Sequence, residues 1–470
     1  MIRSMIDPHI FRAYDIRGKA GTQLTEEACY LIGRAFGTVL QGKYGVENPH
    51  PRVVLGRDAR THSPGFMAKM CEGLMESGCD VSIIGETPSP VNYFTICNAE
   101  FDAGVQITAS HNPKEDNGIK LQIRHAEAYS GESLQELRRM IESKPTPLPA
   151  IRHPLSAHPF DAITPYAEFL VKLFKDVGKG KTVVVDGGNG VAGPVYCDVL
   201  RKTGAKVIEL YTEPDGTFPN HAADPSKHST LRELQEKVRA EKADIGFGFD
   251  GDGDRTGIVD EKGNIVTADQ TLLLLAQDHL SRHKGMPVIF TVSNSSLLET
   301  ETTKWGGRPV MCKVGHSFVE HAMRDNDSKL GGEQSGHFFC GENYFGFDDA
   351  LVACLRILSI LQTHKKPISE LIKEFPTVFQ TLEMRPHCPD HLKAEIIAKT
   401  TAHFQKKYPV ITLDGARIDF GDGAWAGIRF SNTSPCLSIC IEARSEAKLK
   451  AVEEEVLDHM RTYPEIDWKR

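Results

Sequence analysis

Short runs of β-branched residues alternate with helical patterns along the first part of the chain. The segments 52–58 (RVVLGRD), 80–85 (DVSIIG) and 103–110 (AGVQITAS) are typical of strands. After the first of them, the apolar residues of 63–78 (SPGFMAKMCEGLMESG) recur at intervals of three and four, as on one face of a helix. This alternation predicts an α/β fold.

The alternation is interrupted and then restarts. The polar, proline-rich segment 144–159 (KPTPLPAIRHPLSAHP) is typical of a linker. A second α/β unit follows, from the strand pattern of 181–190 (KTVVVDGGNG) to that of 243–250 (ADIGFGFD). A third unit ends after the apolar helix pattern of 348–364 (DDALVACLRILSILQTH), near residue 376. Three α/β units are therefore expected before the C-terminal part of the chain.

The C-terminal part has a different pattern. Two amphipathic helix patterns, at 390–407 and 445–461, flank the strand-like segments 424–432 (AWAGIRFSN) and 436–443 (CLSICIEA). Two such helices fit one face of an antiparallel sheet, which predicts a smaller α+β domain. The predicted domains are 1–151, 152–261, 262–376 and 377–470.

Composition excludes several classes of protein. The 470 residues are 40% hydrophobic and 25% charged, as in a multidomain globular protein, and the net charge of −8 gives no basic footprint for nucleic acid. The most apolar windows are short or interrupted by charge, so we expect neither export nor a membrane partner. The eleven cysteines form no C-x-x-C pair, which indicates reduced thiols in a cytoplasmic protein without a zinc site.

Three carboxylates stand at alternate positions in 247–260 (FGFDGDGDRTGIVD). Asp250, Asp252 and Asp254 cannot lie close together without a cation, and alternate positions of an extended loop point to one side. No His or Cys accompanies them, which favours Mg²⁺ over a transition metal. The competing interpretation is a calcium EF-hand loop, whose twelfth position would be Glu261. Against it, Arg255 stands where that loop requires glycine, and the preceding segment has strand character.

Ser110 lies in a second segment with candidate chemistry, 108–113 (TASHNP). One hypothesis is a nucleophile activated by His111, although adjacent residues make that geometry awkward and the segment is not a G-x-S-x-G elbow. The alternative is a serine that only shapes the turn before Asn112 and Pro113. The alternative would explain the turn but not the aspartate loop.

Several motifs together resemble one family over nearly the whole chain. TASHNP, NGIK (117–120), DGDGDR (250–255), GEQSGH (332–337) and RFSNTSP (429–435) occur in the order found in the α-D-phosphohexomutases. FRAYDIRG (11–18) is most similar to the bacterial phosphomannomutase/phosphoglucomutase branch, and GRDAR (56–60) and PDGTFPNHAADP (214–225) also match signatures of the family. The resemblance implies three α/β mixed-sheet domains around a central cleft and a C-terminal α+β domain.

The resemblance also implies functions for individual residues. Ser110 would be carried as a phosphoserine, and one of its phosphate oxygens would complete the coordination of Mg²⁺ by Asp250, Asp252 and Asp254. Arg17, Lys120 and Arg255 would supply positive charge, with His111 beside the reacting serine. Tyr14, His316, Glu333 and Ser335 would contact the substrate, and Arg429, Ser431, Asn432 and Thr433 would bind its phosphate. His337, Lys120 and His316 are the implied proton-transfer candidates.

The implied reaction interconverts hexose 1-phosphate and hexose 6-phosphate through a hexose 1,6-bisphosphate, which also serves as activator. Two departures from the pattern of that branch concern the identity of the sugar. Ser293 stands where the branch has a lysine, and GEQSGH is the form of the motif that resembles phosphoglucosamine mutases. KVGHSF (313–318), by contrast, favours glucose and mannose phosphates. A phosphoglucosamine mutase, a sugar-phosphate phosphatase and a non-catalytic sugar-phosphate binding protein remain alternatives, as do monomer and dimer.

Overall fold

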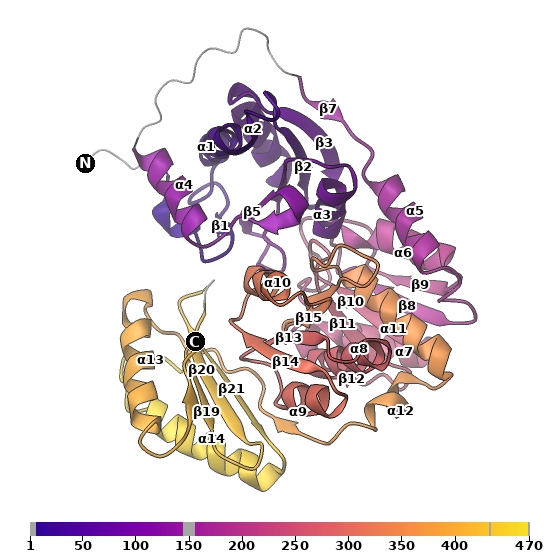
Figure 1. Cartoon of the computed structure of the whole chain (residues 1–470), viewed down its shortest axis with the longest axis vertical. Helices are drawn as coiled ribbons and strands as arrows, with labels where there is room; N and C mark the ends of the chain where they lie inside the picture. The colour runs from indigo at the N-terminus through magenta and orange to yellow at the C-terminus, as the bar shows by residue number, and fades with distance from the viewer. Residues whose placement is uncertain (1–5, 144–155, 432–433, 469–470) are drawn as a thin grey trace. The chain divides into compact units, whose positions relative to one another are not determined.

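A computed structural model describes residues 6–143, 156–431 and 434–468. The chain divides into two compact units, one of residues 1–271 and 335–370 and the other of residues 272–334 and 371–470. The predicted linker at 144–159 lies mostly outside the described residues. Each unit is therefore described by itself (Figure 1).

The first sheet of unit 1 is mixed. Strand β2 pairs in parallel with β3 and β4, whereas β5 pairs antiparallel with β4 and β1. The strands are β1 (Ile16–Lys19), β2 (Arg52–Arg57), β3 (Asp80–Glu86), β4 (Ala103–Ile107), β5 (Asp116–Ile123), β6 (Glu127–Ala128) and β7 (His158–Pro159). The helices are α1 (Glu26–Tyr44), α2 (Ser63–Glu76), α3 (Ser89–Asn98) and α4 (Glu132–Glu142). The three predicted strands and the predicted helix at 63–78 are confirmed.

The second sheet of unit 1 is also mixed, in the order β12-β11-β10-β8-β9. Its strands are β8 (Thr182–Asp186), β9 (Lys206–Leu210), β10 (Ile245–Phe249), β11 (Thr256–Asp260) and β12 (Ile265–Val266). Helices α5 (Ile163–Leu173), α6 (Ala192–Lys202) and α7 (Arg232–Glu241) belong to this region. Strand β16 (Phe338–Cys340) and helix α11 (Ala350–His364) complete the unit. The strand pattern predicted at 243–250 is thus an inner strand of a sheet.

Unit 2 contains a parallel arrangement in which β13 lies between β14 and β15. These strands are β13 (Pro287–Thr291), β14 (Arg308–Cys312) and β15 (Leu330–Gly332), with helices α9 (Leu297–Lys304) and α10 (His316–Asp325). Helices α8 (Ala268–Arg282) and α12 (Ile368–Ile372) cross the boundaries between the units.

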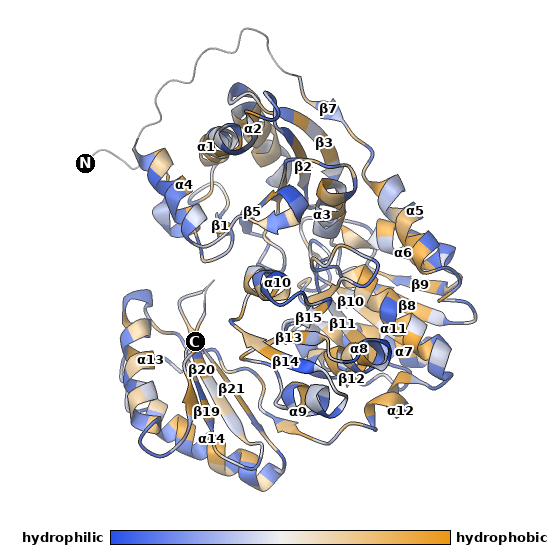
Figure 2. Ribbon diagram, in the orientation of Figure 1, coloured by the Kyte–Doolittle hydropathy of each residue, from blue (hydrophilic) through white to orange (hydrophobic). Residues whose placement is uncertain are grey.

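The C-terminal sheet is antiparallel throughout, in the order β17-β21-β20-β19-β18. It consists of β17 (Phe379–Gln380), β18 (Val410–Ile411), β19 (Ala416–Asp419), β20 (Trp425–Phe430) and β21 (Leu437–Ala443), with helices α13 (Asp390–Phe404) and α14 (Glu446–Met460). Both helices pack on one face, where Ile396 and Val456 share a buried core with Ile428 and Ile439. Hydrophobic and hydrophilic residues alternate around both helices (Figure 2). The predicted α+β arrangement, and with it the fold class, is confirmed.

A cluster of aromatic rings joins three segments of unit 1. Phe94 of α3 packs edge-on against Tyr166 and Phe169 of α5, and its ring also contacts Tyr344. Tyr166 and Tyr344 both donate hydrogen bonds to the buried carboxylate of Asp349, which also caps α11 by accepting the N–H of Val352. The cluster therefore surrounds a carboxylate removed from water.

We predict that Asp349→Asn gains stability relative to the unsubstituted protein as pH rises. Burial raises the pKa of Asp349 to about 6, so its ionisation costs folding free energy between about pH 4 and 6, on the order of 2–3 kcal/mol. The substitution removes this cost. The melting temperature of the variant minus that of the parent should therefore increase as the pH is raised from 4.5 to 7.5.

The matched control for that experiment is Asp161→Asn. Asp161 accepts the N–H of Thr164 at the start of α5, and this hydrogen bond lowers its pKa. Its ionised form is favoured by folding, so the control should move in the opposite direction or not at all. A difference in melting temperature between Asp349→Asn and the parent that does not change with pH would contradict a raised pKa of the buried Asp349 carboxyl.

Candidate active site

Ser110 lies in the loop that joins β4 to β5. Its φ of +52° places it in the left-handed region, and its N–H donates to Thr108 Oγ1 at 2.9 Å. The hydroxyl donates to Asp250 Oδ2 at 2.6 Å, and the distance from Oγ to His111 Nδ1 is 3.2 Å. The serine is therefore not simply a turn residue, because its buried hydroxyl faces the aspartate loop.

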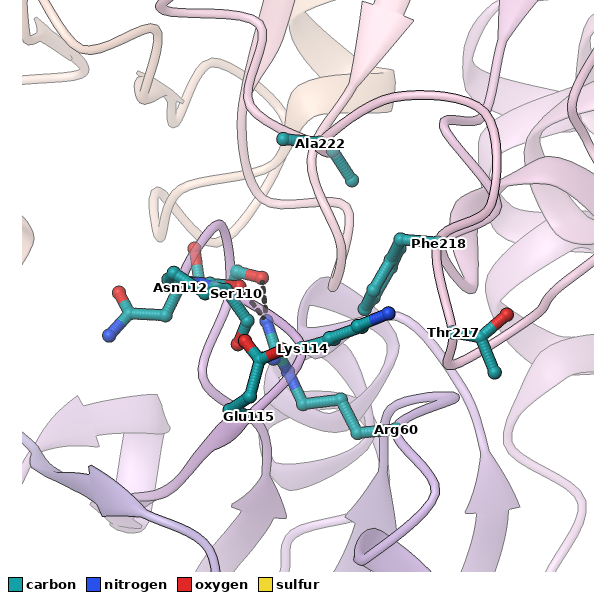
Figure 3. A pocket seen from close by; sticks show the side chains of 10 residues that line it. Arg60, Ser110, Asn112, Lys114, Glu115, Thr217, Phe218 and Ala222 are labelled. Carbon is teal, nitrogen blue, oxygen red and sulfur yellow. Dashed lines mark hydrogen bonds between the residues drawn. The ribbon is translucent and has the colours of Figure 1, made fainter.

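Arg60 holds the backbone of the Ser110 loop. Its guanidinium is buried and donates to the carbonyls of Ser110 (2.8 Å), Asn112 (2.7 Å) and Pro113 (2.7 Å), while its Nε donates to Asp58 at 3.0 Å. Arg60 is one of the residues that line a pocket of about 230 Å³, whose side chains are drawn in Figure 3. The GRDAR motif contains Arg60, but sequence reasoning gave it no function.

The three aspartates converge through a tight turn between β10 and β11. Asp250 Oδ1 accepts the N–H groups of Asp254 and Arg255, both at 3.1 Å, and the three carboxylates present oxygens within 4.8 Å of one another. The predicted convergence is confirmed, but a turn produces it rather than an extended loop. Strands on both sides of the turn exclude the helix–loop–helix geometry of an EF-hand.

Two glycines make this turn possible. Gly253 has a φ of +75°, which a residue with a side chain rarely adopts. A Cβ on Gly251 would lie 2.5 Å from the Ser110 carbonyl oxygen, so only glycine allows the two loops to approach so closely. Ser89, at the start of α3, adds a further connection by donating to Asp252 Oδ2 at 2.6 Å.

Two predicted cations, Lys120 and Arg17, lie beside the serine and the aspartates. Lys120 of β5 contacts Asp252 Oδ2 at 2.9 Å and also Asp254 Oδ2. Arg17 of β1 donates to the Ala109 carbonyl at 3.1 Å and to Asn112 Oδ1 at 2.9 Å. Both side chains are buried, so neither Lys120 nor Arg17 is a solvated surface charge.

Two further predicted residues meet at the same place, Arg255 of the aspartate loop and His337 of a segment 82 residues later in the chain. Arg255 Nε donates to His337 Nε2 at 3.1 Å, and this nitrogen lies 3.4 Å from Asp254 Oδ1. The other ring nitrogen of His337, Nδ1, lies 3.1 Å from Ser335 Oγ. The structure therefore brings the C-terminal half of GEQSGH to the aspartate loop. Tyr14 lies partly buried in the bend before β1.

The pKa shifts follow from this crowding of buried charges. Burial and the neighbouring Asp254 and Asp252 carboxylates raise the pKa of Asp250 well above its usual value. Burial alone would lower the pKa of Lys120, but Asp252 and Asp254 raise it well above its usual value, so the ammonium stays charged. Burial and the nearby Arg255 and Arg17 lower the pKa of His111, which favours the neutral imidazole.

The aspartate cluster fits a divalent cation. Within the described residues, the Oδ1 atoms of Asp252 and Asp254 are buried and accept no hydrogen bond. Buried carboxylate oxygens without donors are costly unless a cation approaches them. An all-oxygen set of this kind suits a hard ion such as Mg²⁺.

Unit 2 holds the remaining predicted residues in two places. Glu333 is buried and accepts the N–H of Gly315 at 2.6 Å, next to His316 at the start of α10. Arg429 of β20 donates to Ser293 Oγ at 3.3 Å, so Ser293 anchors this arginine. Ser431 follows β20 and is buried, whereas Asn432 and Thr433 lie outside the described residues.

Sequence reasoning missed residues that support these sites through contacts distant in the chain. Lys393 of α13 is buried and donates to the carbonyls of Ser431 (3.2 Å) and Ser434 (2.6 Å), which both belong to the RFSNTSP segment. Asp348 is buried with its Oδ2 3.7 Å from His337 Nε2. In the sequence, nothing distinguishes Lys393, within a helix pattern, or Asp348, just before another helix, from surface residues.

Comparison with known proteins decides the family. Four models of phosphoglucomutase/phosphomannomutase domains match the chain: α/β/α domains I, II and III at residues 8–147, 163–263 and 267–379, and the C-terminal domain at 383–459. The chain belongs to the phosphoglucomutase/phosphomannomutase family. The resemblance read from the motifs is thereby confirmed.

Individual members of the family are similar over almost their full lengths. A phosphomannomutase/phosphoglucomutase of Pseudomonas aeruginosa is 38% identical over 450 residues, which cover 94% of this chain and 93% of that protein. A phosphoglucomutase of Neisseria gonorrhoeae is 37% identical over 464 residues, which cover 98% of each. The crystal structure of a phosphoglucomutase/phosphomannomutase family protein from Burkholderia thailandensis superposes with a TM-score of 0.89 at 34% identity, covering 97% of this chain and 98% of that one.

We predict that Lys120→Met binds Mg²⁺ more tightly than the unsubstituted phosphohexomutase chain does. The Lys120 ammonium uses oxygens of Asp252 and Asp254 that a divalent ion would also use, so the two cations compete. Removing the ammonium should lower the Kd for Mg²⁺ about tenfold, which corresponds to about 1.4 kcal/mol. Isothermal titration calorimetry on dephosphorylated protein measures this directly.

Thermal unfolding provides a second measurement for the same variant. Without Mg²⁺ the variant should melt below the parent, since buried carboxylates have lost a counter-ion, and Mg²⁺ should raise its melting temperature by more. Lys172→Met, at an exposed position of α5, is the matched control. Weaker Mg²⁺ binding by Lys120→Met would show that Lys120 supports the ion rather than competing with it.

Proposed function

We propose that this chain is a phosphohexomutase that interconverts hexose 1-phosphates and hexose 6-phosphates, with glucose and mannose phosphates as substrates. The observation that carries the proposal is the Ser110 hydroxyl, which lies 2.6 Å from Asp250 within a cluster of three buried carboxylates. A serine in this position suits a stored phosphoryl group better than a base-activated nucleophile. Membership of the family supports the same activity.

Ser110 is the proposed phosphoryl carrier, and Asp250, Asp252 and Asp254 are the proposed protein ligands of Mg²⁺. When bound, Mg²⁺ would neutralise part of the charge on the phosphoryl group, through one phosphate oxygen on Ser110. A phosphoserine and three aspartates together exceed the charge of one divalent ion, so further cations are required. Arg17, Lys120 and Arg255 are placed to provide them, with neutral His111 beside the serine.

In the first half-reaction the bond between phosphorus and Ser110 Oγ breaks as a bond forms to the free hydroxyl oxygen of a hexose 1-phosphate. The hydroxyl proton passes to a protein base, for which His337 and His316 are the candidates, because the charged Lys120 ammonium can donate a proton but cannot accept one. The product is a hexose 1,6-bisphosphate. After this intermediate turns end for end, its other phosphate returns to Ser110 and the sugar hydroxyl is reprotonated, leaving hexose 6-phosphate.

A second anion site must hold the phosphate that is not being transferred. We assign this task to Arg429, Ser431, Asn432 and Thr433, and the support for the assignment is the way Arg429 and Ser431 are anchored by Ser293 and Lys393. Glu333, Ser335, His316 and Tyr14 are the proposed contacts to the substrate. Glucose 1,6-bisphosphate is the proposed activator, because it can restore a phosphate lost from Ser110.

The alternatives differ in what they leave behind. A phosphoglucosamine mutase is favoured only by the residues of the GEQSGH motif, and a phosphatase would transfer the phosphoryl group to water.

A cytoplasmic location is supported by eleven cysteines that are all free thiols. Among the described residues, no helix combines the length and apolar character needed to cross a bilayer.

We predict that the purified protein, with Mg²⁺ and a trace of glucose 1,6-bisphosphate, converts glucose 1-phosphate and mannose 1-phosphate into their 6-phosphates. Coupled assays with each sugar, and with glucosamine 1-phosphate, measure the preference. Ser110→Ala should lower kcat to less than about a thousandth, since it removes the covalent carrier. Ser281→Ala, an exposed serine in α8, should leave the rate unchanged.

Two results would contradict the proposal. Release of inorganic phosphate in proportion to the substrate consumed would indicate a phosphatase. Saturable binding of sugar phosphates without interconversion, in a protein whose Ser110 peptide carries phosphate by mass spectrometry, would indicate a binding protein.

A further inference from the structure

The C-terminal sheet has a polar face opposite its two helices, and the segment after β17 extends this face. Residues 381–387 run antiparallel to β21, with bridges from Met384 to Ile439 and from His387 to Cys436. Met384 packs against the hydrophobic core, so the alternation of a strand directs Glu383 and Arg385 to the other face. Arg385 thereby comes close to the loop that follows β20.

Arg385 contacts one residue of the predicted phosphate loop, Ser431, and shares the carboxylate of Glu383 with another, Arg429. Its Nη2 donates to Ser431 Oγ at 3.0 Å and to Cys436 Sγ at 3.5 Å. Its Nη1 donates to the Glu383 carboxylate at 3.2 Å, and Arg429 Nη2 lies 3.8 Å from the same carboxylate. Glu383 therefore lies between two guanidinium groups, and the three side chains together carry one net positive charge.

The two arginines differ in access to solvent. The side chain of Arg429 is 12% exposed, whereas that of Arg385 is 43% exposed. Burial would raise the pKa of Glu383, but Arg385, Ser438 and Arg429 lower it, so the carboxylate stays ionised and keeps both guanidiniums fixed. Arg429 is thus the inner and Arg385 the outer guanidinium beside Ser431.

We propose that Arg385 is a second anion-binding residue of the Ser431 site and contacts the phosphate dianion that is not being transferred. The inference rests on the proposed function. A planar guanidinium that already donates to the hydroxyl of the loop can form a bidentate contact with a phosphate at the same hydroxyl. An ordinary surface ion pair between residues 383 and 385 would have no reason to involve Ser431.

Glu383 has the opposite effect on the same site. It neutralises one of the two positive charges and competes with a phosphate for both guanidiniums. Removing the carboxylate should therefore tighten phosphate binding, whereas removing Arg385 should weaken it. A purely structural cluster would weaken binding after either substitution.

The test uses the full-length chain with Arg385→Met, Arg385→Lys and Glu383→Gln. Each is titrated calorimetrically with glucose 1-phosphate and, separately, with inorganic phosphate, and KM and kcat are measured in the coupled assay. Arg385→Met should raise the Kd and KM about tenfold with little change in kcat, and Arg385→Lys should recover part of the loss. Glu383→Gln should lower the Kd for both ligands.

Arg461→Met, an exposed arginine at the end of α14 in the same domain, is the matched control and should behave as the parent. Equal melting temperatures exclude a folding defect. An active mutase whose Arg385→Met variant keeps the parental Kd and KM, or a Glu383→Gln variant that binds phosphate more weakly, would overturn the inference. A parent that interconverts no hexose phosphates would instead refute the proposed function, while the phosphate titrations would still test Arg385.

Discussion

The structure of unit 1 depends on the concentration of negative charge around Ser110. Three carboxylates are removed from water within a few ångströms of one another, and a phosphoryl group on the serine would add almost two more charges. Such a site is stable only where cations balance it. The buried Lys120, Arg17 and Arg255 are part of that balance, and the proposed divalent ion would bind the aspartate oxygens that accept no hydrogen bond among the described residues.

Two loops from different sheets have to meet for this balance to exist. Gly251 allows contact with the Ser110 carbonyl, Arg60 ties down the serine loop, and Ser89 binds Asp252 from the start of α3. The positive φ of Ser110 turns its hydroxyl toward Asp250 instead of continuing the strand. Two of the family motifs, 140 residues apart in the chain, thus contain residues that contact each other in the fold.

The sequence was most informative where chemistry is local. The short β-branched runs that became β2 and β4, the strand pattern that became β10 and the helical period of α2 were recognised because strands and helices have distinct residue patterns. The aspartates were recognised by their alternate spacing, whereas Ser110 was assigned its function through the family motifs. The supporting residues Lys393, Asp348 and Arg385 were not recognised from the sequence, because only folding brings their distant segments close to the residues that they support. The domain limits at 151, 261 and 376 stay predictions, as do the ligand sets.

The central claim is that one divalent ion is held by Asp250, Asp252 and Asp254 beside the phosphoryl group of Ser110. Crystals of the phosphorylated protein grown with Mn²⁺, a substitute for Mg²⁺ that scatters anomalously, test it most directly. The account predicts one strong anomalous peak bounded by those three carboxylates and a phosphate oxygen on Ser110. A peak bound elsewhere, or none at this cluster while the enzyme in the same solution is active, would contradict it.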